Sequence, residues 1–116
     1  MGHYDTNLDK NNANHIPLTP LSFLERAKDV YPEYEAIVYE DRKFTWSEVY
    51  KRVTKFASAL KKIGIGKGDT VSFLAFNTPE IFEGHYSVPM TGAVLNTINI
   101  RLDANTIAYI LKHSDA

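Results

Sequence analysis

The sequence contains no cysteine. This absence excludes a disulfide framework, a thiolate nucleophile and a zinc site built on sulfur ligands. Positive and negative charges almost balance, because the chain has 13 lysines and arginines and 14 aspartates and glutamates, which gives a formal net charge of -1. Such a balance exerts no long-range attraction on nucleic acid or anionic lipid. We therefore expect no nucleic-acid partner, and the cytoplasm, a reducing compartment, is the expected location.

Long apolar runs are also missing. No apolar stretch approaches the ~18 residues that a membrane-spanning helix needs, so we expect no transmembrane segment. The first residues are polar and rich in asparagine, unlike a signal peptide. We interpret residues 1–18 as a flexible leader and residues 19–116 as the incomplete N-terminal part of one folded domain.

What is present is an alternation of helices and strands with recognisable helix ends. Thr19 can cap a first helix that stops before Pro32. Thr45 and Glu48 form a capping box that starts a longer helix, and Gly64 stands where a left-handed C-terminal cap is needed. Both helices place apolar residues at helical spacing, so each should cover a core.

A hairpin is expected between these two helices. Residues 35–40 alternate toward a strand, and residues 43–45 follow as a second short strand. Asp41 and Arg42 are the expected tight turn.

A parallel pair of strands is expected in the second half. Residues 71–76 form an almost continuous apolar run, which is typical of a strand covered on both faces. A helix begins at Thr78 and Pro79, and a second strand occupies residues 93–98. Because a strand, helix, strand unit closes with right-handed crossover, these strands should be parallel. Asp103 caps a last helix over residues 104–113. The fold class is thus α/β, a partial parallel sheet with flanking helices.

The glycines near the end of the long helix do not predict a phosphate loop. Gly64, Gly66 and Gly68 surround Lys67, but a phosphate cradle runs from a strand into a helix. Here a helix precedes the glycines and a strand follows them. We interpret residues 66–69 as a turn.

In an open α/β sheet, ligands bind beyond the carboxyl ends of the strands. The positions to examine are therefore Asn77, Thr78, Asn99 and Arg101, although they form no catalytic set. Arg101 could clamp a phosphate or a carboxylate, but a lone arginine is more often held in a surface or interdomain salt bridge.

His85 is expected to be a packed or partly buried imidazole in the middle of a helix, near Ile81 and Val88. Neither a second histidine nor a carboxylate is placed to orient it as a ligand or base. The remaining histidines, His3, His15 and His113, are expected to face solvent.

Two binding modules are disfavoured. Glu40 and Asp41 after a strand resemble the acidic pocket of a response-regulator receiver, but a receiver needs a helix directly after that strand. The aromatic residues, 12% of the chain, are spread out and form no stacking row on one sheet face, so an RNA-binding sheet is also disfavoured.

Four short series stand in an order that resembles the amino-terminal part of the AMP-forming acyl-CoA synthetases, in the adenylate-forming superfamily. They are Phe44-Thr45-Trp46-x-Glu48, Leu60-x-x-x-Gly64-Ile65-x-x-Gly68-Asp69-x-Val71, Asn77-x-Pro79-Glu80 and Gly92-Ala93-Val94-x-x-x-x-Asn99-x-Arg101-Leu102. The match covers about residues 17–116. Ile100 departs from the pattern, since many members have a small or polar residue there.

The resemblance implies the start of the large N-terminal domain of an acid–CoA ligase. Such an enzyme uses ATP and Mg to convert a carboxylic acid to acyl-AMP, and transfers the acyl group to coenzyme A. In this family the phosphate loop, nucleotide contacts, metal-binding acid and mobile C-terminal domain all lie downstream of the matched segment. No catalytic, cofactor-binding or metal-binding residue can therefore be assigned here, and we expect the chain alone to be inactive.

The resemblance implies a short- or medium-chain fatty acid or a related small acid, a ligase of fatty acid metabolism, and a possible homodimer. The alternative hypothesis is a stand-alone small α/β interaction or regulatory module without catalysis. The sequence leaves open which acid is used, the oligomeric state, and whether the chain is a truncation or a natural short protein.

Overall fold

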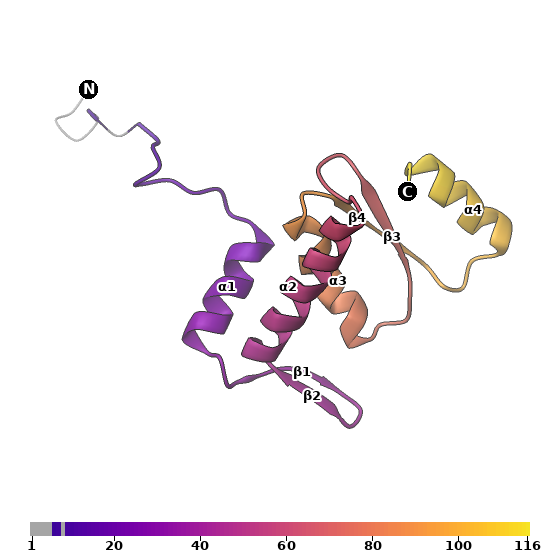
Figure 1. The fold of residues 1–116 in the computed structure, drawn as a ribbon, viewed down its shortest axis with the longest axis horizontal. Helices are drawn as coiled ribbons and strands as arrows, with labels where there is room; N and C mark the ends of the chain where they lie inside the picture. Colours follow the sequence, from indigo (N-terminus) through magenta and orange to yellow (C-terminus); the bar gives the residue numbers. More distant parts are fainter. Residues whose placement is uncertain (1–5, 8) are drawn as a thin grey trace.

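A computed structural model of the chain describes residues 6, 7 and 9–116, and within these it contains four helices and four strands. The elements in order are α1 (Pro20–Val30), β1 (Glu35–Tyr39), β2 (Arg42–Thr45), α2 (Trp46–Lys62), β3 (Thr70–Leu74), α3 (Pro79–Met90), β4 (Val94–Ile98) and α4 (Ala104–His113). Strands β1 and β2 pair antiparallel, while β3 and β4 pair parallel (Figure 1). The expected α/β class with a partial parallel sheet is confirmed. None of the described helices is long and apolar enough to span a membrane.

The helix ends follow the local chemistry of the sequence. At the start of α2, the Thr45 hydroxyl accepts a hydrogen bond from the Glu48 amide at 3.3 Å, and the Glu48 carboxylate accepts one from the Thr45 amide at 2.8 Å. At the start of α4, the Asp103 carboxylate accepts from the Asn105 amide at 3.0 Å and from the Thr106 amide at 3.1 Å. Beyond α2, Gly64 has a φ of +97°, the left-handed conformation that glycine adopts without steric cost. The predicted caps are confirmed.

The hairpin turn differs from the prediction by one residue. Tyr39 pairs with Arg42, so the two turn residues are Glu40 and Asp41, and Arg42 already belongs to β2. Glu40 has a φ of +53°, which supplies the positive φ that a two-residue hairpin loop requires. The predicted turn at Asp41 and Arg42 is therefore wrong, because the cross-strand register places the loop one residue earlier.

The three helices α1, α2 and α3 pack against one another, with the hairpin at their lower end in Figure 1. Leu24, Val49 and Val53 form their shared core and are each at most 1% exposed. Half-buried side chains from the hairpin and from α3, such as Ile37, Phe44 and Phe82, close this core from the sides. We call α1, α2, α3 and the hairpin the helical layer.

A second cluster joins the helical layer to the β3–β4 sheet. Leu60 of α2 and Val88 of α3 pack with Val71, Phe73 and Leu95 of the strands. Gly84 makes this approach possible, because a Cβ at that position would lie only 2.9 Å from the Phe73 ring. One face of the sheet is thus covered by α2 and α3.

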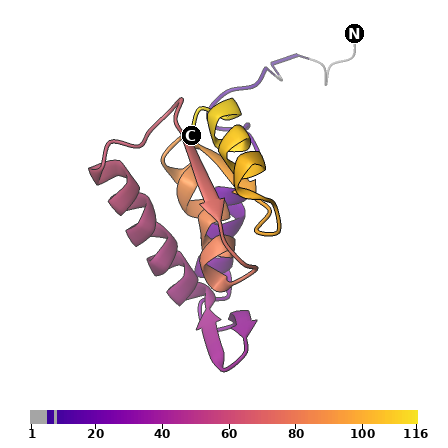
Figure 2. The ribbon, with the colours of Figure 1, turned by 90° about the vertical axis from the view of Figure 1, so that its right-hand side faces the viewer.

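The other face of the sheet is incompletely covered. Figure 2 shows α4 on the opposite side of β3 from α2, but α4 has no buried residue. The Asn96 amide links this helix end to the sheet, donating to the Ser114 hydroxyl at 3.0 Å and to the Ser72 hydroxyl at 2.9 Å. Leu74 and Val94 remain 55% and 60% exposed. The expectation of a strand covered on both faces over residues 71–76 is therefore wrong for this chain. We call β3, β4 and α4 the open sheet.

The described part of the predicted leader contains neither helix nor strand. It includes a turn in which the Asn11 amide donates to the Asn14 side chain at 2.9 Å. Figure 1 shows this segment extending away from α1. Residues 1–5 and 8 of the leader lie outside the described residues, and its flexibility stays a prediction.

Candidate functional site

The loops that follow β3 and β4 meet at one edge of the sheet, where they line a groove of about 830 Å³. Asn77 comes from the first loop, and Asn99 and Arg101 come from the second. The groove is completed by Ile81 and His85 of α3 and by Tyr39 of the hairpin. We call it the strand-end groove. Three of the four positions expected at the carboxyl ends of the strands are thus brought together.

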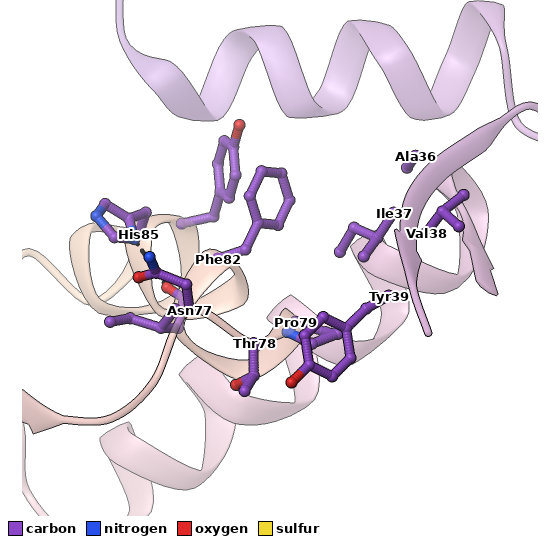
Figure 3. Close-up of a pocket in the computed structure, with 11 residues that line it drawn as sticks. Ala36, Ile37, Val38, Tyr39, Asn77, Thr78, Pro79, Phe82 and His85 are labelled. Carbon is purple, nitrogen blue, oxygen red and sulfur yellow. Dashed lines mark hydrogen bonds between the residues drawn. The ribbon is translucent and has the colours of Figure 1, made fainter. Parts of the chain in front are cut away.

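The fourth position, Thr78, lies in an adjoining pocket of about 630 Å³ beside the hairpin. Figure 3 shows the hairpin residues Ala36, Ile37 and Val38 on one side of this pocket and Phe82 and His85 on the other. We call it the hairpin pocket; Tyr39, Asn77, Ile81 and His85 line it as well as the strand-end groove. The two hollows therefore form a continuous surface with one polar end and one apolar end.

Arg101 is the charged group of the strand-end groove. Its backbone amide donates to the Asn99 side-chain oxygen at 2.9 Å, which fixes the loop around it. The guanidinium makes no ion pair within the described part of the chain, and none of the groove-lining residues is an aspartate or glutamate. The salt bridge expected for a lone arginine is not formed between Arg101 and any described residue.

His85 is exposed, contrary to the expectation of a packed or partly buried imidazole. It lies on the outward side of α3, whose buried positions include Glu83, Gly84 and Val88. Its Nδ1 donates to the Ile81 carbonyl at 2.8 Å, since a carbonyl oxygen can only accept. In the neutral ring this bond leaves Nε2 without a proton, so Nε2 can only accept a hydrogen bond from a ligand.

An ion-pair network beside the hairpin pocket was not foreseen from the sequence. Arg52 of α2 donates to both carboxylate oxygens of Glu83, one of them at 3.1 Å, and lies 3.6 Å from Glu80. Arg42 of β2 pairs with Glu80, and both guanidinium groups lie over the Phe44 ring, at 5.3 Å for Arg42 and 4.7 Å for Arg52. The network ties the hairpin to α2 and α3.

The same network sets the charge state of Glu80. The hydrogen bond from Arg42, assisted by backbone hydrogen bonding, lowers the pKa of Glu80 to about 2. The sequence did contain one signal, because Glu80 and Glu83 stand three residues apart and so share a face of α3. No pattern in the neighbouring sequence indicated which basic residues would form ion pairs with these two glutamates.

The described residues do not fit a magnesium ion, and the glycine turn does not fit a nucleotide phosphate. They contain no group of three histidine, cysteine or acidic side chains that could hold a metal. In the glycine turn over residues 66–69, the Gly66 amide donates to the Asp69 carboxylate at 2.7 Å. An amide that would have to face a phosphate is thus bonded to an acidic side chain of the same turn.

Comparison with known proteins defines the class. Residues 24–116 match the AMP-binding enzyme family, and the chain belongs to this family. It is 52% identical over 103 residues to a peroxisomal butyrate–CoA ligase of Arabidopsis thaliana, covering 89% of this chain and 18% of that protein. It is 53% identical over 109 residues to a peroxisomal trans-cinnamate:CoA ligase of Petunia hybrida, covering 94% of this chain and 19% of that protein.

The fold agrees with a solved member of the adenylation enzymes. The N-terminal subdomain of NpsA from Klebsiella oxytoca superimposes with a TM-score of 0.78 over 84% of this chain and 26% of that one. At 22% identity this likeness shows the fold alone. The chain thus spans about a fifth of the length of its curated relatives and has the architecture of an N-terminal subdomain.

Proposed function

We propose that this chain forms the first part of the N-terminal domain of an acid–CoA ligase. The whole enzyme would use ATP and Mg to convert a carboxylic acid to acyl-AMP with release of pyrophosphate, and would then form a thioester with coenzyme A. The observation that carries this proposal is identity above 50% to two proteins named as CoA ligases, within a family match over residues 24–116.

The proposed substrate is a short- or medium-chain carboxylic acid. The relatives are named for an aliphatic acid and for an aromatic acid, yet this chain is 52% identical to the first and 53% identical to the second. This segment therefore does not distinguish the two kinds of acid. The parts that select the acid should lie elsewhere in the full-length enzyme.

We further propose that the chain alone carries no ligase activity. Acyl adenylation requires neutralisation of phosphate charge and a carboxylate held in line with the α-phosphorus. The described residues offer one guanidinium in an open groove and a glycine turn closed by Asp69. These groups do not meet that requirement.

A chimera tests the proposal. Residues 1–116 would replace the matching segment of the A. thaliana butyrate–CoA ligase, and ATP–pyrophosphate exchange and butyryl-CoA formation would be measured. We expect kcat/KM within about tenfold of the parent, a loss of at most ~1.4 kcal/mol of transition-state stabilisation. The isolated chain should give no exchange with butyrate or cinnamate.

A matched control is the same chimera with Val53→Asp, which disrupts the buried core and should abolish activity by unfolding. A folded chimera without activity would contradict the assignment to the ligases. Exchange catalysed by the isolated chain would contradict the proposed inactivity.

The second candidate is a stand-alone interaction module, and the closed core of the helical layer is the feature that favours it. A complete module should melt cooperatively as a monodisperse monomer. Part of a larger domain should instead self-associate through exposed apolar residues such as Leu74, Phe76 and Val94. Analytical ultracentrifugation combined with a thermal melt distinguishes the two.

Cytoplasmic location and homodimer formation of the full-length enzyme stay predictions. Both relatives above are named as peroxisomal proteins, so location needs a direct measurement. Microscopy of the tagged full-length protein against a peroxisomal marker decides it, and sedimentation of the same protein decides the oligomeric state.

A further inference from the structure

We propose that the strand-end groove binds the anionic group of a small molecule, a carboxylate or a phosphate, with the Arg101 guanidinium as its charged partner. This site goes beyond the proposed function, which assigns no ligand to the residues of this chain.

The first support is the unbalanced charge of the groove. Of the arginines around the two hollows, Arg42 and Arg52 are neutralised by Glu80 and Glu83. Arg101 has no acidic partner among the described residues, and no carboxylate lines its groove. A concave surface with one unneutralised guanidinium concentrates anions, even though the chain as a whole carries a net charge of -1. The planar guanidinium also matches the two oxygens of a carboxylate or phosphate.

The second support is a set of polar groups without partners around that charge. The Asn99 oxygen already accepts from the Arg101 amide, which leaves the Asn99 NH₂ as a donor. Two further polar groups line the groove, the Asn77 side-chain amide and the Tyr39 hydroxyl. Within the described part of the chain, these two groups and the Asn99 NH₂ have no hydrogen-bond partner. The groove therefore offers hydrogen-bond donors beside its one charge.

The third support is the position of these groups. Asn77 and Asn99 follow the carboxyl ends of two paired parallel strands, the edge where α/β sheets bind ligands. The groove, of about 830 Å³, has room for a small anion. Its continuation into the hairpin pocket, between Ile37 and Phe82, could accept a short apolar body attached to the anionic group.

An NMR titration of the isotope-labelled 116-residue chain tests this site. Three probes are added separately at constant ionic strength: sodium butyrate, inorganic phosphate and butyramide, the uncharged analogue of butyrate. We expect butyrate or phosphate to shift the signals of Asn77, His85, Asn99 and Arg101, with a Kd on the order of 1 mM. Tighter binding of butyrate identifies a carboxylate with an apolar body, and tighter binding of phosphate identifies a phosphate group.

The matched variants are Arg101→Gln and Arg26→Gln. Both arginines are exposed, but Arg26 lies on α1 and does not line the groove. Arg101→Gln should weaken binding at least about tenfold, because a hydrogen-bonded charge is removed, whereas Arg26→Gln should leave it unchanged. Unchanged thermal melts of both variants would show that the fold is intact.

Three results would overturn the site: equal shifts with butyramide, equal weakening by the two variants, or no shift with either anion at about 20 mM, twentyfold above the expected Kd. The titration measures binding to this chain alone. An inactive ligase chimera would therefore not contradict the anion site. A titration without shifts would not contradict the ligase assignment.

Discussion

The helical layer and the open sheet bury their apolar side chains to different extents. In the helical layer, Leu24, Val49 and Val53 are at most 1% exposed and are enclosed by residues of three helices and the hairpin. In the open sheet, Leu74 and Val94 are more than half exposed, and α4 buries no residue. A two-stranded sheet is marginal alone and needs further strands or a packed face. The helical layer encloses one core of its own and shares a second cluster with one face of the sheet. The other face of the sheet depends on covering elements, which a longer ligase would supply under our proposal.

The largest change in stability is expected when the same charged residue, aspartate, is placed in each region in turn. Val53→Asp buries a carboxylate without a partner and should cost at least about 4 kcal/mol in the free energy of unfolding. Val94→Asp, at a position 60% exposed, should cost no more than about 1 kcal/mol. Urea unfolding followed by the fluorescence of Trp46, the single tryptophan, measures both. Equal losses would show that the two regions share one core.

The next test concerns the ion pair that closes the helical layer. Glu83→Gln leaves the half-buried Arg52 guanidinium without its bidentate partner, and we expect a loss of about 2 kcal/mol. The matched change Glu80→Gln removes a carboxylate that is about half exposed and should cost less than about 1 kcal/mol.

A double substitution separates the value of this pair from the cost of breaking it. Replacing both partners, Arg52→Met with Glu83→Leu, should destabilise less than Glu83→Gln alone, because no half-buried guanidinium is left without its bidentate partner. A double variant that is less stable than the single one would contradict this account.

A smaller effect is expected at the helix starts. Thr45→Ala removes the hydroxyl that accepts from the Glu48 amide and should cost about 1 kcal/mol. Thr78 is also an N-cap residue, but its side chain makes no capping hydrogen bond, so Thr78→Ala should cost less than about 0.5 kcal/mol. A thermal melt of each variant by circular dichroism gives the order.

The smallest effect is a dependence of stability on pH. The pKa of Glu80 is lowered from 4.5 to about 2 in the folded chain, so its ion pair stabilises the fold above its ordinary pKa. That contribution is lost as the pH falls from about 4.5 to about 2, and solvent screening limits it to about 0.5 kcal/mol. Other carboxylates titrate in the same range. The informative quantity is therefore the difference in the free energy of unfolding between the wild-type chain and Glu80→Gln. This difference should shrink toward low pH. A difference that stays constant with pH would contradict the proposed role of Glu80.

The helix ends were predictable because their signals are local. The capping box of Thr45 and Glu48, the left-handed Gly64 and the cap at Asp103 each depend on residues within one helical turn. The parallel pairing of β3 and β4 followed from crossover handedness. The hairpin turn was predicted one residue too late, because the pairing register of the two strands sets the position of the turn and the turn dipeptide does not.

The candidate site was predictable only in part. The rule on carboxyl ends of strands indicated Asn77, Asn99 and Arg101, which do line one groove. Tyr39 and His85 were not included, since they come from a hairpin and a helix that no local pattern places beside those loops. The pairing of Arg52 with Glu83, 31 residues apart, was missed for the same reason.

The sequence by itself determined the order, type and ends of the elements and the membership in the AMP-binding family, because these depend on residues close together along the chain and on motif order. The tertiary structure alone decided which side chains meet at the strand-end groove and which ion pairs close the helical layer. It also decided that His85 is exposed and that Arg101 is left without an acidic partner among the described residues. These properties depend on distances between elements, and packing sets those distances only once the core of the helical layer has formed.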